Sequence, residues 1–586
     1  MAAKTKPNRR PNQMTGAQLM MRALKKYDLT TAFCLAGTAH GHLLVEMAKE
    51  KITIIPGRNE SATVGAADGY ARVTGKLGVA LINAEHGLPN AMTGILTAHG
   101  ACSPVLVLLT MPYGNRADAQ GGYPSNVLEM VSPFVKYCQL VPDVDRLQEY
   151  VEVAVRHCTS GRPGVAVLGI PNGFQGAAIE YAEGVNPDPT HVPQPEPDTE
   201  AIAEAALLLS KAKRPLILAG SGATLSGAGS ALKKFIKAYN IPVFANALGR
   251  GLVPEDNVLS YSWPLANLTP AAADVVVVLG MRLTQRMAYG LAPRFDRKAK
   301  FIQIDIEPEE IGRNRPIHVG VVSDARRAVE MLHKALRKMK VKPKADPSWI
   351  RKALKPRLDR IGELAKSPAG GPIQPIDMAR AITAYMPKTT IYAGDGADTQ
   401  NWMHGFLQVR AERSFLDHYP VGCMGTALPL AVGAAAASKE EAEKNGTKPR
   451  PVVLVTGDGA FGFYCAEINA AVMAGLPLMV VICNDGCWGT EKHGQIVQLG
   501  EVINCELGHN DYQLIGQAFG AMSLKVDDPA KLDATMKRAY RAVSDGPVVV
   551  NILVDGEAGL VRKKDPLVQT IAFSDLKVSQ AAQYDF

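Results

Sequence analysis

The sequence lacks features that would define several broad classes of protein. It has no run of about eighteen apolar residues, so no transmembrane helix and no membrane partner are predicted. The basic first twelve residues are followed by no apolar segment, which favours a polar leader over a secretory signal. None of the nine cysteines forms a C-x-x-C pair, and most lie in apolar segments, which is typical of reduced core thiols in a cytoplasmic protein.

The charge pattern also excludes a class of partner. The basic stretches Lys4–Arg10 and Lys334–Lys344 are not interleaved with aromatic residues, so nucleic acid is not an expected partner. The net charge of +8 is mild for 586 residues, and it suits small anionic cofactors or substrates better. A chain of this length is expected to fold into three or four domains.

Short apolar runs alternate with longer helix-like segments along the chain. The runs are continuous in Val, Ile and Leu, which indicates strands buried on both faces of parallel sheets. Alternating βα units predict an α/β protein with three doubly wound parallel-sheet domains. The predicted strands are Thr31–Leu35, Ile52–Ile55, Gly78–Ile82, Val105–Leu109, Val165–Leu168, Leu216–Leu218, Val243–Ala245, Val275–Leu279, Phe301–Ile304, Thr390–Tyr392, Val452–Val455, Leu478–Cys483 and Val548–Ile552.

Two linkers divide these units into blocks. Gly184–Thr199 contains five prolines, and Lys340–Pro375 combines basic residues, prolines and a predicted short helix. The predicted domains are therefore residues 13–184, 196–340 and 374–560, which we call the first, central and third blocks. Residues 561–586 are predicted to form a tail or lid.

The third block carries a paired motif at two strand ends. Strand Val452–Val455 leads into Thr456 and Gly457-Asp458-Gly459-Ala460, and the next strand ends at Asn484-Asp485-Gly486. A glycine turn after a strand lets backbone amides approach a diphosphate. The Asp458 carboxylate, the Asn484 side-chain oxygen and the Gly486 carbonyl would supply the hard oxygen ligands that Mg²⁺ prefers. The alternative is that each tripeptide is only a turn.

The paired motif resembles the diphosphate-binding motif of thiamine-diphosphate-dependent enzymes. Cys483 stands where that family usually has another asparagine, but all three metal-ligand positions are retained. The resemblance extends over residues 14 to 555 and implies a pyrimidine-binding, a central Rossmann-like and a diphosphate-binding domain. It also implies thiamine diphosphate and Mg²⁺ as cofactors. Gly394-Asp395-Gly396-Ala397 follows a strand too, and by resemblance it is another loop beside the diphosphate, with Ala397, Asp398 and Thr399 as phosphate contacts.

The first block resembles the family's segment for cofactor activation. Arg58-Asn59-Glu60, Asp68-Gly69-Tyr70-Ala71-Arg72 and Thr74-Gly75-Lys76 match that segment densely. The resemblance makes Glu60 the glutamate that hydrogen-bonds the aminopyrimidine and promotes loss of the C2 proton. An isolated glutamate at a helix start would otherwise be a solvated residue favoured by the helix dipole. Asn90 is a further predicted cofactor contact, and Tyr70 and Arg72 are predicted to have packing roles.

A loop in the third block resembles the one that bends the cofactor. In Gly422-Cys423-Met424-Gly425, Met424 would separate the two rings and the Gly422 carbonyl would accept a hydrogen bond from the aminopyrimidine. Methionine is a flexible, polarizable side chain that suits this role. A core methionine at a helix start is the alternative.

Three further residues are candidates for proton transfer. His40 and His86 lie on strand-end loops, and Glu85-His86 stands where relatives commonly have Gly-Pro. A histidine there could act as general acid or base. Glu491 belongs to Cys487–His493, which resembles benzaldehyde lyase and is predicted to line the substrate pocket.

The central block leaves its own role open. Met281-Arg282-Leu283, Gly290–Arg294 and Phe301–Ile306 resemble 2-hydroxyacyl-CoA lyases and oxalyl-CoA decarboxylases. Relatives hold FAD or ADP in this block, and Gly220-Ser221-Gly222 is a candidate loop for either. The alternative is a purely structural Rossmann-like domain.

The resulting prediction is a carbon–carbon lyase or carboligase of the acetolactate synthase type, acting on 2-oxo acids or 2-hydroxy carbonyl compounds. A 2-hydroxyacyl-CoA lyase or oxalyl-CoA decarboxylase is the alternative. A nucleotide-binding oxidoreductase and a non-catalytic homologue are alternatives from other classes. The resemblance also implies a homodimer or homotetramer, in which Glu60 of one chain serves the cofactor held by another.

Overall fold

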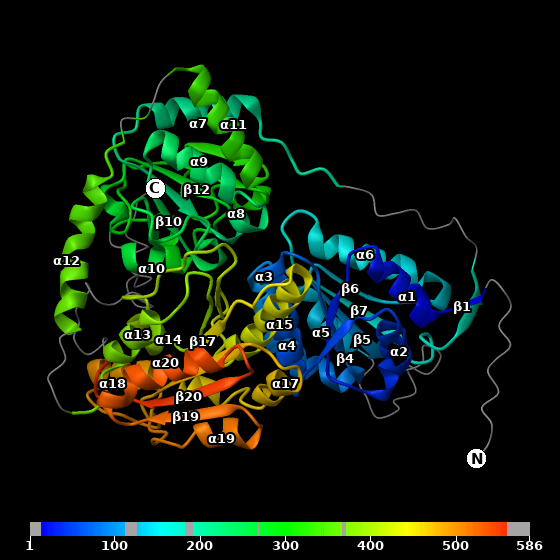
Figure 1. Cartoon of the computed structure of the whole chain (residues 1–586). Helices are drawn as coiled ribbons and strands as arrows, with labels where there is room; N and C mark the ends of the chain where they lie inside the picture. The colour runs from blue at the N-terminus through cyan, green and yellow to red at the C-terminus, as the bar shows by residue number, and fades with distance from the viewer. Residues whose placement is uncertain are drawn as a thin grey trace, which may run out of the picture.

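Three six-stranded parallel sheets organise the molecule, as predicted. The computed structural model describes residues 13–111, 126–181, 192–267, 269–340, 343, 345–365 and 371–559, apart from the side chains of residues 84 and 85. The predicted leader and the tail from residue 561 lie outside these residues. Figure 1 shows the central block above and beside the other two, which lie next to each other.

Each sheet has its own strand order. The first is β3 (Thr53–Pro56), β2 (Thr31–Cys34), β4 (Gly78–Ile82), β5 (Val105–Met111), β7 (Val165–Pro171) and β6 (Tyr137–Leu140). The central sheet is β11 (Ser260–Ser262), β10 (Val243–Ala245), β9 (Pro215–Ala219), β12 (Val275–Leu279), β13 (Lys300–Asp305) and β14 (Val319–Val322). The third is β16 (Phe415–Asp417), β15 (Ile391–Gly394), β17 (Val452–Gly457), β18 (Leu478–Asn484), β20 (Val548–Leu553) and β19 (Met522–Val526). β1 (Gln13–Thr15) pairs antiparallel with β8 (Ala178–Glu180).

Helices cover the sheets and connect the parallel strands. Those of the first block are α1 (Gly16–Lys25), α2 (Gly41–Lys49), α3 (Glu60–Thr74), α4 (Ala84–Gly100), α5 (Val127–Val131) and α6 (Leu147–Thr159). The central block has α7 (Thr199–Ser210), α8 (Ser221–Leu225), α9 (Gly229–Tyr239), α10 (Trp263–Ala266) and α11 (Ala325–Lys338), and α12 (Ser348–Leu364) lies in the second linker. The third block has α13 (Pro375–Ala384), α14 (Ala397–Met403), α15 (Ala427–Asn445), α16 (Asp458–Phe461), α17 (Glu467–Met473), α18 (Gly489–Gln498), α19 (Gln513–Ala518) and α20 (Leu532–Ala542). No described helix is long and apolar enough to cross a membrane.

The first and third blocks share one hydrophobic core through α3 and α15. The two helices lie side by side in the middle of Figure 1. Small residues permit their close approach, since a Cβ on Gly433 would lie 1.8 Å from the Ala66 carbonyl oxygen. Likewise, a Cβ on Gly69 would lie 2.0 Å from the Leu430 carbonyl oxygen. The backbones therefore pack directly on each other, and this contact fixes the first block against the third.

Tyr70 and Arg72 reinforce this contact, in line with their predicted packing role. The Tyr70 hydroxyl donates to the Glu440 carboxylate at 2.8 Å. Arg72 is paired with Asp68 on its own helix and donates from Nη1 to the Asp417 carbonyl oxygen at 2.9 Å. Each side chain thus links α3 to the third block.

Candidate active site

A large cavity of about 840 Å³ lies between the third sheet and the central block. The carboxyl ends of β15 and β17 contribute to its wall, which is the sheet edge where ligands bind in open α/β folds. Ten of the predicted site residues line it together: Ala397, Asp398, Thr399, Gly422, Met424, Gly457, Asp458, Gly459, Ala460 and Glu491. The structure therefore brings the predicted diphosphate and ring-contact loops to one place.

The Gly457–Ala460 turn, which we call the diphosphate loop, begins at the last residue of β17 and leads into α16. The Asp458 carboxylate accepts from the amides of Gly459 at 2.8 Å and Gly486 at 3.1 Å, which joins the two strand ends. A Cβ placed on Gly457 would meet only the Thr399 hydroxyl, at 3.4 Å. The space above the loop is thus open toward α14, where a diphosphate would need it.

The Asn484 side chain fits a role as metal ligand. Its amide nitrogen donates to the Asn510 carbonyl oxygen at 2.9 Å and to the Asn551 side-chain oxygen at 3.1 Å. Its side-chain oxygen is buried and has no hydrogen-bond partner. A buried acceptor without a donor costs free energy, and a cation would relieve that cost. The two acceptors on the nitrogen side fix which end of the amide faces the site.

The Gly486 carbonyl does not fit its predicted role in the same way. It already accepts from the amides of Leu507 at 2.7 Å and Gly508 at 2.8 Å. Both bonds hold the 505–508 segment against the strand end, so the oxygen would have to lose them to bind a cation. In the described part of the chain, no three His, Cys, Asp or Glu side chains group around a metal position. The Asn484 side-chain oxygen can therefore take a cation without losing a hydrogen bond, whereas the Gly486 carbonyl would first give up amide bonds, and its role as a ligand stays a prediction.

Three buried carboxyl groups, those of Asp398, Asp458 and Asp485, lie close together in the site. Burial, followed by the charge of Asp485, raises the pKa of Asp458 to about 8 and that of Asp398 to about 7. Burial also raises the pKa of Asp485. Such groups repel one another when ionised, and a divalent cation beside them would lower each pKa. One oxygen of Asp398 is buried without a hydrogen-bond partner.

The loop Gly422–Gly425 places Met424 at the cavity. Gly422 and Gly425 have φ angles of +83° and +86°, a backbone region that favours glycine. Met424, between them, is 39% exposed and lines the cavity. A large apolar side chain exposed on this turn is suited to contact with a bound ring system.

Glu60 does not line the large cavity of its own chain. It is the first residue of α3, is 9% exposed, and accepts from the Asn90 side chain at 3.3 Å. The preceding loop packs on α17, because the Arg58 amide donates to the Glu467 carboxylate at 3.0 Å. Glu60 is not among the described residues that line the large cavity.

His40 does not support its predicted catalytic role. The ring is fully buried, its Nε2 lies 2.8 Å from the Ile82 carbonyl oxygen, and its Nδ1 lies 3.2 Å from the Gln175 side chain. Burial lowers the pKa of His40 to about 4, so the ring is neutral. The 3₁₀ turn Thr38–His40 directs the side chain into the core, where both nitrogens are used.

The other two proton-transfer candidates, Glu491 and His86, differ in whether they line the large cavity. Glu491, in the first turn of α18, is exposed and lines the large cavity. His86 and Asn90 are exposed in the first half of α4, on the same side as Glu60. His86 does not line the cavity within the described chain.

Other cavity residues were missed by the sequence motifs. Arg286 and Arg294 reach the cavity from the central block, and His418 reaches it from the end of β16. Burial lowers the pKa of both arginines, while Tyr419 and Asp417 favour the charged form of Arg286. The rule that ligands bind at the carboxyl ends of parallel strands could have suggested Arg286, which follows β12 by a few residues.

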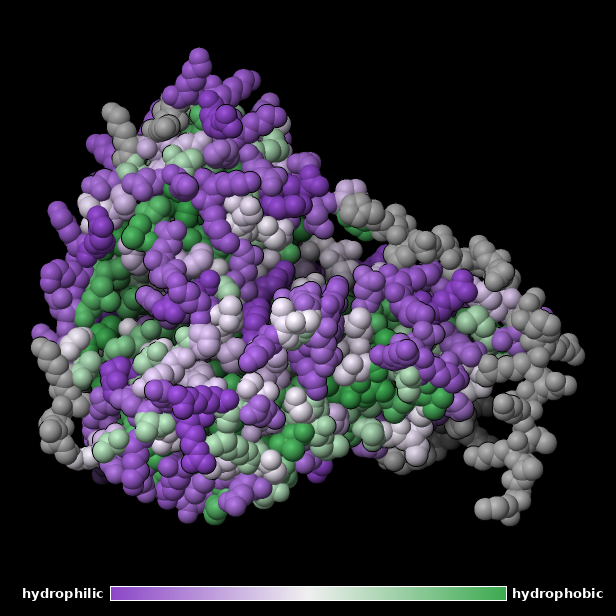
Figure 2. All heavy atoms as spheres, in the orientation of Figure 1, coloured by the Kyte–Doolittle hydropathy of each residue, from purple (hydrophilic) through white to green (hydrophobic). Residues whose placement is uncertain are grey.

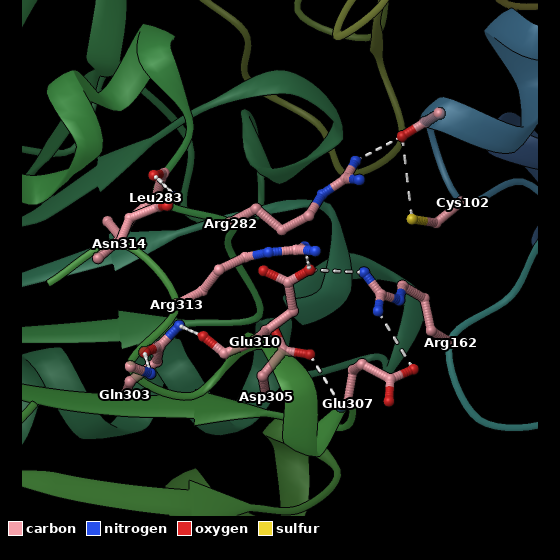
Figure 3. A network of polar contacts seen from close by, with 12 residues as sticks. Cys102, Arg162, Arg282, Leu283, Gln303, Asp305, Glu307, Glu310, Arg313 and Asn314 are labelled. Atoms are coloured by element: carbon pink, nitrogen blue, oxygen red, sulfur yellow. Dashed lines mark hydrogen bonds and ion pairs between the residues drawn. The ribbon is translucent and has the colours of Figure 1, made fainter.

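A smaller cavity of about 290 Å³ adjoins the first at the carboxyl edge of the central sheet. Figure 3 shows part of its surroundings, where side chains of the first and central blocks meet. Arg162 pairs with Glu307 at 3.2 Å and with Glu310 at 2.9 Å, and Arg282 donates to the Gly100 carbonyl oxygen. These contacts fix the end of α4 against the central sheet.

Comparison with known proteins identifies all three blocks. The N-terminal TPP-binding domain of thiamine pyrophosphate enzymes matches residues 14–125, the central domain residues 202–332, and the C-terminal TPP-binding domain residues 395–552. The chain is 27% identical over 569 residues to 2-hydroxyacyl-CoA lyase 1 of Mus musculus, covering 94% of this chain and 96% of that protein. It is 27% identical over 574 residues to an acetolactate synthase of Arthrospira platensis, covering 92% and 94%. The crystal structure of benzoylformate decarboxylase from Polynucleobacter necessarius aligns with a TM-score of 0.78 at 20% identity, covering 92% and 99%.

Proposed function

The chain belongs to the thiamine pyrophosphate enzyme family, and from this premise we propose that it makes or breaks a carbon–carbon bond in a 2-oxo acid. The bound cofactor supplies an electron sink next to the substrate carbonyl. One observation carries the choice of substrate: Arg286 and Arg294 reach the same cavity as the diphosphate loop. Arginine binds carboxylates through paired N–H groups, so either residue is suited to a substrate carboxylate.

A 2-hydroxyacyl-CoA thioester is the second candidate, and the relatives of that name support it. Such a substrate has no carboxylate next to the reacting carbonyl, so it would not need the arginines. Turnover of pyruvate, benzoylformate and a 2-hydroxyacyl-CoA should be compared with the same preparation. Turnover of the thioester alone would overturn the 2-oxo acid proposal.

Arg286→Gln provides the sharper test of the same proposal. Loss of a charge-assisted hydrogen bond costs about 1.5–3 kcal/mol, which corresponds to an increase in KM of about 10- to 150-fold. The increase is expected for pyruvate, whereas KM for a neutral 2-hydroxy ketone should be unchanged, because that substrate lacks the carboxylate. An equal effect on both substrates would indicate that Arg286 only shapes the pocket.

We propose Mg²⁺ as the cation that joins the cofactor to the third block. Its protein ligands would be the Asp458 carboxylate and the Asn484 side-chain oxygen, with the remaining positions filled by diphosphate oxygens and water. The unpartnered oxygen of Asn484 and the position of Asp458 on the wall of the large cavity support this assignment. Ala397 and Thr399 are suited to the phosphates, since both line the cavity at the start of α14.

A second copy of the chain is proposed to complete the site. Glu60 lies outside the large cavity of its own chain, while Asn90 and His86 lie beside it on an exposed face. At the cavity, Val421 is 44% exposed and Met424 39%, and the nearby Phe463 is 54% exposed. Figure 2 shows a mainly hydrophilic surface interrupted by several hydrophobic areas, some of them over the first block. A homodimer is the smallest assembly that joins these surfaces, and the homotetramer and the cytoplasmic location stay predictions.

For the smaller cavity we propose an adenine nucleotide, either ADP or FAD. The cavity lies at the ends of β9, β12 and β13, where the Gly220–Gly222 loop approaches Gly280 closely. Asp305, at the end of β13, can accept from ribose hydroxyls, and Arg282 can contact a phosphate. Saturation at about 100 times Kd is expected to stabilise the fold by about 2.7 kcal/mol, measured as a rise in Tm with ADP or FAD but not with adenine alone. No rise with either nucleotide would favour the structural interpretation.

A further inference from the structure

Two residues that follow neighbouring strands form a buried acid–imidazole pair. β15 and β16 are parallel, and their register pairs Gly394 with Asp417. The next residues, Asp395 and His418, therefore lie side by side at the carboxyl edge of the third sheet. The His418 Nδ1 is 2.9 Å from an Asp395 carboxylate oxygen, and the side chains are 2% and 1% exposed.

Backbone amides fix the Asp395 carboxylate in place. Its Oδ1 also accepts from the Gly396 amide at 2.8 Å, and its Oδ2 accepts from the Ala427 amide at 2.9 Å. Ala427 is the first residue of α15, a helix of 19 residues. Amide donors favour the ionised carboxylate. The Asp395 carboxylate accepts a hydrogen bond from Nδ1–H of His418, so the lone pair of the neutral imidazole lies on Nε2.

His418 is one of the residues that line the large cavity, together with the diphosphate loop. The Tyr419 ring packs edge-on at 4.2 Å between centroids and limits rotation of the imidazole. The charged groups around it are Asp395, the adjacent Asp417 and the Arg286 guanidinium, which lies over the Tyr419 ring. A histidine oriented by a carboxylate and facing a substrate cavity is the arrangement used for general acid–base catalysis.

We propose that His418 exchanges a proton with the substrate during the reaction and that Asp395 is its positioning residue. This inference rests on the proposed function of the large cavity. In the step, the His418 imidazolium donates its Nε2 proton to the carbonyl oxygen of the 2-oxo acid as the carbonyl carbon forms its new bond, so the π electron pair of the carbonyl becomes the O–H bond. The electron pair of the new bond would come from the carbon that the bound cofactor supplies, and it would return there when the product leaves. As the product carbonyl forms, Nε2 takes the proton back and the O–H electron pair returns to the carbonyl, so the protein has no net change in charge. Asp395 stabilises the imidazolium form.

His418→Gln tests the proposal in the cofactor-loaded enzyme. Because general acid–base groups contribute about 10²- to 10⁴-fold, kcat should fall at least about 100-fold with the fastest substrate among pyruvate, benzoylformate and the 2-hydroxyacyl-CoA. KM and the Kd for thiamine diphosphate should stay within a few fold. Exchange of the cofactor C2 proton with deuterium should be unchanged, since that step depends on Glu60. The pH profile of kcat should lose one limb, and Asp395→Asn should shift that limb.

His404→Gln is the matched control. His404 is equally buried, at 4% exposure in the same block, but it does not line the large cavity. Its substitution should lower Tm without changing kcat per loaded site. If the parent enzyme is active and the His418→Gln variant is equally active, the inference is wrong while the proposed function stands. A raised Kd for the cofactor with unchanged kcat would refute it too, because His418 would then be a phosphate contact. A parent enzyme that turns over none of the substrates would refute the proposed function, and the inference with it.

Discussion

Glu60→Gln is expected to abolish turnover while leaving the bound cofactor in place. Glutamine keeps the size of the side chain and can still bond Asn90, which donates to Glu60 at 3.3 Å. It cannot share a proton with the aminopyrimidine, so removal of the C2 proton should slow at least about 100-fold. The rate of C2 hydrogen–deuterium exchange, followed by proton NMR after acid quenching, measures this step without any substrate.

Glu440→Gln is a suitable control for that experiment. Glu440 accepts from the Tyr70 hydroxyl at 2.8 Å and from the Thr31 hydroxyl at 2.7 Å, so it joins α15 to the first block. Its substitution should lower Tm while C2 exchange per bound cofactor stays the same. If Glu60→Gln exchanges the C2 proton as fast as the parent, Glu60 has no part in activation.

The inner strands of the three large sheets could be predicted from the sequence, whereas most of their edge strands could not. Strands such as β4, β12 and β18 are buried on both faces, and their continuous apolar runs reveal them. In the three large sheets the missed strands, β6, β11, β14, β16 and β19, all lie at edges, where β3 alone was predicted. The short pair of β1 and β8 was missed as well. In β14 buried and exposed residues alternate, and β6 is half-buried at best. Edge strands pack on fewer neighbours, so they need less apolar sequence.

In the site, too, residues placed by the local sequence could be predicted, whereas residues placed by tertiary contacts could not. Gly457, Asp458 and Asn484 could be predicted because each directly follows or ends an apolar strand. His40 was misjudged because a 3₁₀ turn decides which way the loop side chain points, and the core satisfies both ring nitrogens. His418 was missed because its partner is 23 residues away, and only the parallel register of β15 and β16 brings the two together.

Asp458→Ala is expected to remove cofactor binding from the third block. The substitution deletes a charged ligand of the proposed Mg²⁺ and the acceptor for the Gly459 and Gly486 amides. Loss even of groups that only orient a metal ligand costs about 10- to 100-fold in affinity, so the Kd for thiamine diphosphate should rise at least about 100-fold. Trp488 packs against Gly459, so its fluorescence is a suitable signal for the titration. An unchanged Kd would place the cofactor elsewhere.

The two inactive variants together decide whether the site is shared between chains. In a purified heterodimer of Glu60→Gln and Asp458→Ala chains, one site has the intact third block of the first chain and Glu60 of the second. That site should be active, and the other lacks both groups, so about half of the parent turnover is expected per dimer. Restored activity requires that the first block of one chain serves the cofactor of its partner. If each chain formed its site alone, every site would lack one group and the mixture would stay inactive. The position of Glu60 outside the large cavity of its own chain supports the first outcome.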